Sequence, residues 1–135
     1  MRYRGRMKLS VKPSTRHGKG LFAGENIPWG ARIIEYQGEQ ISDAIAEERI
    51  AAGADCIFEL ADNVNIDGAL NGNRARYVNH ERRKPNCFIL REGGRIWIVA
   101  GIEGIPKGEE LTFDYGSSFY PRRNGSRPRG GRSSQ

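Results

Sequence analysis

The residues best suited to chemistry are concentrated in the stretch 72–80, which reads Gly-Asn-Arg-Ala-Arg-Tyr-Val-Asn-His. Amides, guanidinium groups, a phenol and an imidazole follow one another there with few apolar residues between them. The apolar positions are too sparse for the buried stripe of a helix, and the stretch is too long for a simple turn. Long ordered segments of this kind often serve as binding loops. A solvated basic loop is the alternative, and the rest of the chain decides between the two.

The charge of the chain is segregated along its length. Residues 1–20 hold seven Lys and Arg and no acid, and residues 116–135 hold five Arg and no acid. Residues 21–115 carry ten bases against sixteen acids, a net charge of −6. The basic ends could make weak contacts with nucleic acid, whereas the acidic body would attract a basic ligand such as a Lys- and Arg-rich peptide. Segregated charge that serves only solubility is the alternative.

The length of 135 residues predicts one domain with a substantial core. We expect a soluble, intracellular protein without membrane contact. No apolar stretch reaches the roughly 20 residues that span a membrane, and no apolar run follows the N-terminal charges as it would in a signal peptide. The two cysteines, Cys56 and Cys87, leave a disulfide open, but they would need both histidines to complete a four-ligand zinc site.

Short strand candidates separated by Gly-rich turns predict a mainly β domain. The candidates cover residues 7–11, 31–36, 56–60, 63–66, 87–91 and 95–100. One short, peripheral helix is expected from Ser42 to Ala52, where Ser42 can cap it, Asp43 suits its positive end and Gly53 can end it. The segment 121–135 is rich in Gly, Ser, Arg and Pro, and we expect it to be a flexible basic tail.

Two stretches of the chain share one pattern, which is Ala-Gly, then Ile-Pro-x-Gly, then a strand candidate that ends in an acid followed by Tyr. The first runs from Ala23 to Tyr36 and the second from Ala100 to Tyr115. A solenoid needs three or more stacked repeats. We therefore interpret the two stretches as a pair of similar turn–strand units.

Five motifs occur in order along the chain, and together they are far more specific than any one alone. They are Gly18-Lys19-Gly20-Leu21-Phe22, Glu35-Tyr36-Gln37-Gly38-Glu39, Asp67 with residues 72–80, Pro85-Asn86, and Gly-Glu-Glu-Leu-Thr-Phe-Asp-Tyr-Gly at 108–116. With these motifs the chain resembles the SET domain of protein lysine methyltransferases, from about Lys8 to Tyr120.

The resemblance implies a SET-type fold over residues 1–120, with the tail 121–135 outside it. This fold is mainly β, with several small curved sheets, one short helix and a knot-like threading of the C-terminal Asp-Tyr segment past the Asn-His segment. It also implies S-adenosylmethionine as the methyl donor in one pocket, and a target lysine that enters a narrow channel from the opposite face. The implied partner is a basic, lysine-containing protein such as a histone or histone-like tail.

Carried over by position, the resemblance assigns a donor-binding set. Its members are Lys19, Gly20, Leu21, Arg74, Asn79, His80, Tyr115, Phe119 and Tyr120. The backbone around Lys19 and Gly20 would hold the amino-acid end of the donor, and His80 would face the adenine, which Phe119 or Tyr120 would cover.

Three tyrosines are the candidate catalytic residues. Tyr115 would lie at the transfer point, where its phenol can orient the lone pair of the amine. Tyr77 and Tyr36 would be walls of the pocket, with core packing as the alternative. Methyl transfer to an amine is an in-line displacement, so positioning supplies most of the catalysis. Aromatic faces suit the positive sulfonium, and a dry channel lowers the pKa of the lysine. The chemistry requires no metal, and we expect no metal site.

The chain departs from the family pattern in two places. The family usually reads Asn-His-Ser-Cys-x-Pro-Asn, whereas residues 81–84 here are Glu-Arg-Arg-Lys, one residue longer and without the cysteine. Cys56 stands where many relatives carry a channel tyrosine, which would widen a channel that also contains Phe58 and Phe113. At position 113, Phe tends to accompany multiple methylation. A domain without flanking cysteine-rich segments could dimerise to complete its channel.

These departures motivate an alternative function, a catalytically weak SET fold that serves as a binding module for DNA or a protein partner. A plain β-barrel that binds nucleic acid is disfavoured. Such proteins stack bases on aromatic residues set among basic ones, whereas the aromatic strands of this chain lie in its acidic part.

Overall fold

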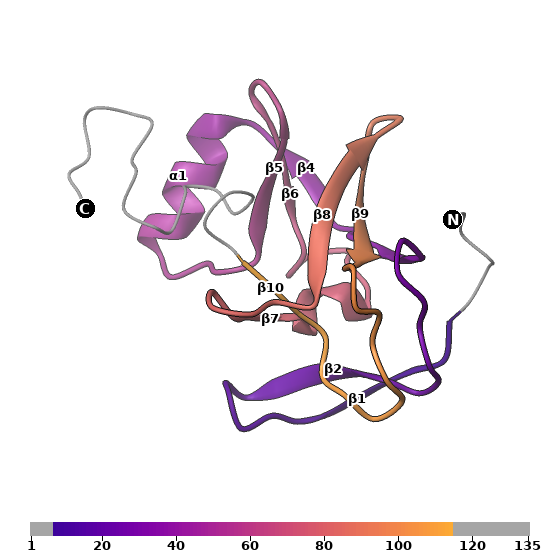
Figure 1. Cartoon of the computed structure of the whole chain (residues 1–135). Helices are drawn as coiled ribbons and strands as arrows, with labels where there is room; N and C mark the ends of the chain where they lie inside the picture. Colours follow the sequence, from indigo (N-terminus) through magenta and orange to yellow (C-terminus); the bar gives the residue numbers. More distant parts are fainter. Residues whose placement is uncertain (1–6, 115–135) are drawn as a thin grey trace.

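The computed structural model describes residues 7–114 as one α-helix, a short 3₁₀ helix and a set of short strands (Figure 1). The strands are β1 (Leu9–Pro13), β2 (Lys19–Ala23), β3 (Arg32–Glu35), β4 (Glu39–Ile41), β5 (Ile57–Ala61), β6 (Val64–Asp67), β7 (Asn79–His80), β8 (Cys87–Glu92), β9 (Arg95–Ala100) and β10 (Thr112–Phe113). The α-helix is α1 (Asp43–Ala51), and the 3₁₀ helix is η1 (Arg74–Tyr77). No helix within residues 7–114 is long and apolar enough to cross a membrane.

The strands form four small sheets, which confirms the prediction of a mainly β fold. Two antiparallel sheets have the orders β4-β6-β5 and β3-β9-β8, and β1 and β2 form a separate hairpin. In the fourth sheet β10 runs parallel to β7, with Thr112 opposite Asn79 and Phe113 opposite His80. Figure 1 shows β10 laid along β7, between the two three-stranded sheets and the hairpin. The Asn-His segment therefore lies beside the strand that directly precedes the Asp-Tyr motif, in line with the meeting of these two parts that the resemblance implied.

Helix α1 has the capping residues that the sequence predicts. The Ser42 hydroxyl accepts a hydrogen bond from the Ile45 amide at 3.2 Å, which satisfies one of the unpaired amides of the first turn. Gly53 follows the helix with φ +107°, a conformation that favours glycine. Because Ala46 is the one buried residue of the helix, α1 covers the β4-β6-β5 sheet from outside, as its thin apolar face indicated.

The hairpin turns also follow the sequence signals. Gly93 and Gly94 join β8 to β9 with φ values of +64° and +74°, and Glu92 pairs with Arg95 across the turn. Two consecutive residues with positive φ are the requirement of a type I′ turn, whose twist matches that of the strands. Asn63, with φ +59°, plays a similar part between β5 and β6.

A row of three aromatic rings joins the sheets in the core. The Tyr36 ring lies 4.6 Å from the Phe58 ring, and the Phe58 ring lies 5.3 Å from the Phe113 ring in an edge-to-face arrangement. These rings come from the end of β3, from β5 and from β10, so the two-residue strand β10 contributes a central core side chain. Its burial helps to hold β10 between the sheets.

The two similar turn–strand units face each other across a local, nearly two-fold arrangement. Ile27 and Ile105 exchange both backbone hydrogen bonds at 2.8 Å. The Gly30 amide donates to Ala100, and the matching Gly108 amide donates to Ala23. Each unit therefore satisfies backbone groups of the other unit.

Asn86 holds the chain leading into β10 against the start of β8. Its side-chain oxygen accepts from the Thr112 amide at 2.9 Å, and its side-chain nitrogen donates to the Glu110 carbonyl at 2.8 Å. Its own carbonyl accepts from the Gly101 amide. The Pro85-Asn86 motif thus has a structural task, since one carboxamide replaces the hydrogen bonds of a missing neighbouring strand.

We predict that Ile105→Ala lowers the free energy of unfolding by about 2–5 kcal/mol, because the side chain is 2% exposed and truncation leaves a cavity. The matched control is Ile102→Ala, three residues away and 78% exposed, which should change stability by less than about 0.5 kcal/mol. Urea denaturation of both variants measures the difference. Equal losses would show that the paired units do not contribute to the core as described.

Candidate active site

A cavity of about 550 Å³ lies between the turn that joins β1 to β2, the η1–β7 segment and the residues before β5. Volumes of this size are typical of small-molecule sites. It is lined by Arg16, His17, Gly18, Lys19, Asp55, Cys56, Arg76, Tyr77, Asn79 and His80. The fold therefore brings together five residues that the sequence predicted for the site, namely Lys19, Cys56, Tyr77, Asn79 and His80.

The carboxamide of Asn79 fixes the glycine-containing turn at the edge of the cavity. Its nitrogen donates to the carbonyls of His17 at 3.2 Å and Lys19 at 3.0 Å, and to Glu110 Oε2 at 2.8 Å. Asn79 is itself buried on the short strand β7. One side chain therefore sets the position of a turn that lies about sixty residues away in the sequence.

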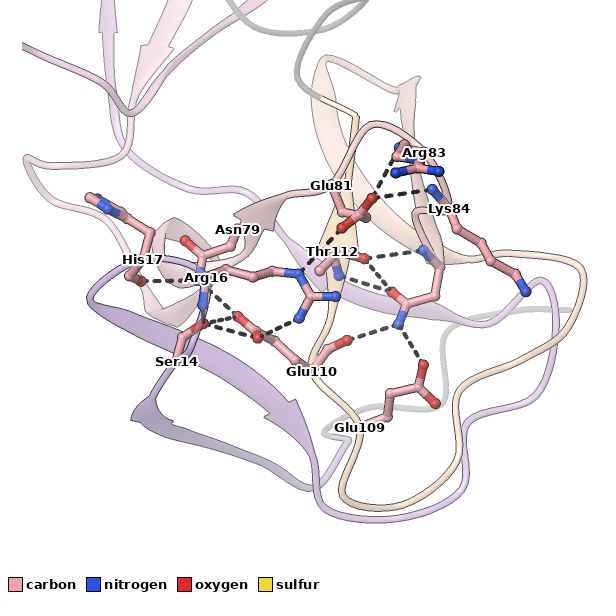
Figure 2. A network of polar contacts seen from close by, with 11 residues as sticks. Ser14, Arg16, His17, Asn79, Glu81, Arg83, Lys84, Glu109, Glu110 and Thr112 are labelled. Carbon is pink, nitrogen blue, oxygen red and sulfur yellow. Dashed lines mark hydrogen bonds and ion pairs between the residues drawn. The ribbon is translucent and has the colours of Figure 1, made fainter.

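Glu110 is the centre of this polar network (Figure 2). The residue is 7% exposed, and its carboxylate accepts from the Ser14 hydroxyl at 2.9 and 3.0 Å, from the Arg16 guanidinium at 3.0 Å and from Asn79. A Cβ added to Gly20 would collide with the Glu110 carboxylate. A larger residue at position 20 would therefore have to displace this carboxylate from the network, which favours glycine there.

The stretch 72–80 forms η1 and β7, and it is attached at both ends. Asn73 caps η1 by accepting from the Ala75 amide at 3.2 Å, and its nitrogen donates to the Glu35 carbonyl at 2.9 Å. At the other end, the His80 ring lies 3.9 Å from the carboxylate of Asp114, the last described residue. The stretch is therefore an ordered wall of the cavity and not a solvated loop.

The two arginines of η1 take different directions. Arg76 lines the cavity, and its guanidinium lies 5.2 Å from the centre of the Tyr77 ring. Arg74 instead donates to the carbonyl of Leu9 at 2.9 Å and holds β1 against η1. The donor-binding role of Arg74 stays a prediction, and Arg76 is the one of these two arginines that lines the cavity.

Several other predicted site residues belong to the core behind the cavity. Tyr36, Phe58, Phe113 and Leu21 are all buried. The Tyr36 hydroxyl donates to the Cys56 carbonyl at 2.8 Å, so this tyrosine positions the backbone of a cavity residue. Tyr115, Phe119 and Tyr120 lie outside the described residues.

The thiol of Cys56 is held in its neutral form. Burial raises its pKa to about 11, and the neighbouring Asp55 adds to the rise through its charge and through the contact that Asp55 Oδ1 makes with Cys56 Sγ at 3.4 Å. Burial likewise raises the pKa of Cys87 to about 12. Both thiols are free, so the disulfide that the sequence left open is not formed.

Five of the ten cavity residues were not among the predicted site residues, and one of them, Gly18, is the first residue of the quoted Gly18-Lys19-Gly20 motif. Arg16 and His17 immediately precede the Gly18-Lys19-Gly20 motif, and Asp55 precedes the channel position, so a wider window around each motif would have included them. Arg76 lies inside the stretch that was singled out. Within residues 7–114 no group of three or more His, Cys, Asp or Glu side chains is placed to hold a metal ion.

The SET-domain family model matches residues 18–116. Histone-lysine N-methyltransferase 2B of Homo sapiens is 37% identical over 128 residues, which cover 85% of this chain and 5% of that protein. The H3 lysine-4 specific histone-lysine N-methyltransferase of Schizosaccharomyces pombe is 38% identical over 117 residues, which cover 80% of this chain and 13% of that protein. The chain thus spans a small part of the length of the relatives that it matches.

Solved structures agree with this assignment. The structure described as "ctPRC2 in an autoinhibited conformation bound to S-adenosylmethionine" superposes with a TM-score of 0.73 at 31% identity, over 83% of this chain and 15% of that one. An active polycomb repressive complex 2 in the basal state gives a TM-score of 0.75 at 32% identity, over 84% and 16%. The chain belongs to the SET-domain family.

We predict that Cys56 reacts with iodoacetamide at pH 8 about 100-fold more slowly in the native protein than in denaturant, because only the thiolate is nucleophilic. Asp55→Asn should speed the native reaction, since it removes a negative charge that raises the pKa of the thiol. Mass spectrometry of the alkylated peptide gives both rates. Native reactivity equal to that of the unfolded chain would contradict the partly buried, neutral thiol.

Proposed function

We propose that this chain is an S-adenosylmethionine-dependent protein-lysine N-methyltransferase. One observation carries the proposal, which is that a single cavity joins the motif turn at Gly18, the Asn79-His80 strand and the channel position Cys56. Family membership and relatives named histone-lysine N-methyltransferases support it. The relatives are much longer than this chain. The proposal therefore rests on the cavity of this chain and not on the relatives' names alone.

The lining of the cavity fits the proposed donor. The cations Arg16, Lys19 and Arg76 and the anion Asp55 surround it, which suits a donor with a zwitterionic amino-acid end. When bound, S-adenosylmethionine would supply an electrophilic methyl group. Lys19 and the backbone of its turn would hold the amino-acid end, and Asn79 keeps that turn in place.

The residues on the far side of the cavity would receive the lysine. Tyr77 presents a ring there, and the hydroxyl of Tyr36 keeps the Cys56 backbone in position. Phe58 and Phe113 pack behind them and exclude water. Apolar surroundings disfavour a charged amine and so help the lysine to lose its proton. The association of Phe113 with multiple methylation stays a prediction.

A basic protein tail, histone or histone-like, is the proposed substrate. Residues 39–67 carry eight acids and one arginine, a net charge of −7. They form β4, α1, β5 and β6, and they include Asp55 and Cys56 at the cavity. The negative charge of the chain body is thus concentrated in the part that borders the proposed channel, where it would raise the rate of encounter with a basic peptide.

Two further partner proposals rest on the sequence. The basic ends, residues 1–20 and 116–135, would contact nucleic acid weakly, and loss of residues 117–135 should then reduce that affinity. A homodimer would complete the channel, and its formation is measured by sedimentation. The alternative function, a binding module with little turnover, is favoured by Cys56 at the channel position and by the altered segment 81–84.

We predict that the full chain transfers labelled methyl groups from S-adenosylmethionine to histones, and that Tyr115→Phe lowers the rate about 100-fold at saturating donor, because the phenol orients the amine. Donor affinity, measured by calorimetry, should change much less. The control Arg32→Gln breaks an ion pair with Glu92 on the distant β3-β9-β8 sheet, and it should leave transfer unchanged. Donor binding without transfer to any basic protein would contradict the enzyme and favour the binding module.

A further inference from the structure

The turn at residues 14–18 forms one side of the cavity, and few backbone contacts hold it. The Ser14 amide donates to the Gly18 carbonyl at 2.7 Å, and Asn79 binds the carbonyls of His17 and Lys19. In the middle of the turn the Arg16 amide donates to the Ser14 hydroxyl at 2.9 Å, and the Arg16 side chain reaches outward to Glu81 and Glu110.

The Arg16 guanidinium lies between two carboxylates (Figure 2). One guanidinium nitrogen lies 3.0 Å from Glu110 Oε1, and Nε lies 3.6 Å from Glu81 Oε1. The Glu110 side chain is almost fully buried and that of Glu81 is about a quarter exposed. A guanidinium shared by two partly desolvated carboxylates is held more firmly than one in an exposed pair.

Glu81 is in turn fixed by its own segment. Its second oxygen, Oε2, accepts from the backbone amides of Arg83 at 3.0 Å and Lys84 at 3.4 Å. These amides, together with Arg16, hold the pKa of Glu81 below its ordinary value, so the carboxylate is ionised at neutral pH. The first residue of the segment that departs from the family pattern therefore organises that segment and also binds Arg16.

We propose that Arg16 is a positioning residue for the methyl donor, because its bridge between Glu81 and Glu110 fixes the turn at the edge of the donor cavity. The inference rests on the proposed function of that cavity. A turn that is ordered before the donor binds loses less conformational entropy on binding, so the donor binds more tightly. In this account residues 81–84 act on the donor site at a distance, since Glu81 lies outside the ten described residues that line the cavity.

Calorimetric titration of the full chain with S-adenosylmethionine tests the bridge. Arg16→Gln and Glu81→Gln should each weaken donor binding about threefold to tenfold, with the turnover rate at saturating donor nearly unchanged. The double variant should lose no more than the weaker-binding single variant, because both changes break one bridge. The control Arg32→Gln should bind as the unaltered chain does.

Hydrogen exchange of the Ser14 amide gives a readout that needs no donor. Both variants should speed this exchange about threefold to tenfold, because the amide closes the turn. Unchanged exchange in both variants would overturn the positioning role. So would weaker donor binding in Arg16→Gln alone, which would indicate a direct contact between Arg16 and the donor.

The two proposals can fail separately. If the unaltered chain bound no S-adenosylmethionine, the proposed function would be wrong, and the exchange of the Ser14 amide would still decide whether Arg16 fixes the turn. If the chain bound the donor and the two variants showed additive losses, the function would stand and the shared bridge would be refuted.

Discussion

The hydrogen bond between Asn79 and Glu110 is the contact on which this structure depends most. It joins the short strand β7 to the residues that lead into β10, at 2.8 Å and out of solvent. A carboxylate buried without partners would cost several kcal/mol, yet Glu110 is satisfied by three side chains from two distant segments. The same network that permits β10 to lie beside β7 also shapes the turn of the cavity. Fold and site therefore share one set of interactions.

Around this contact, hydrogen bonds and packing of single side chains hold the short strands in place, where a larger sheet would use backbone hydrogen bonds. Strands β7 and β10 have two residues each, too few for a ladder to hold them. Asn86 supplies the hydrogen bonds that a further strand would have made, and Phe113 fixes β10 by packing into the aromatic row. The two turn–strand units pair in the same economical way, through the backbone hydrogen bonds that Ile27 and Ile105 exchange. Short strands joined in this way leave room for the cavity between the β1–β2 turn, the η1–β7 segment and the residues before β5.

Local signals allowed much of the fold to be predicted from the sequence. The cap at Ser42, the glycine pair at 93–94 and the paired turn units act within a few residues, and the structure contains each of them. The ordered motifs also indicated which segments meet at the cavity. The structure gives physical reasons for individual motif residues. Gly20, for example, leaves room for the Glu110 carboxylate.

The remaining features depend on contacts between distant segments, which no local pattern reports. The resemblance assigned Arg74 to the donor, and no local pattern reported that Arg74 donates to the Leu9 carbonyl, 65 residues earlier in the chain. Arg76 is the η1 arginine that lines the cavity. Glu81 looked like a departure from the family pattern, and its partner Arg16 stands 65 residues earlier in the chain. The acidic segment 39–67, which includes α1, shows its relation to the cavity only once Asp55 and Cys56 are seen to line it.

The affinity for S-adenosylmethionine of two buried-asparagine variants tests the central claim most directly. Asn79→Ala removes the carboxamide that holds the cavity turn. Asn65→Ala removes a buried carboxamide of β6 that bonds to Asp43 and Ile41, away from the cavity. Both variants should lose stability in urea, but at a temperature where both are folded only Asn79→Ala should bind the donor more weakly, by about tenfold or more. Equal affinities in folded Asn79→Ala and Asn65→Ala would contradict the account.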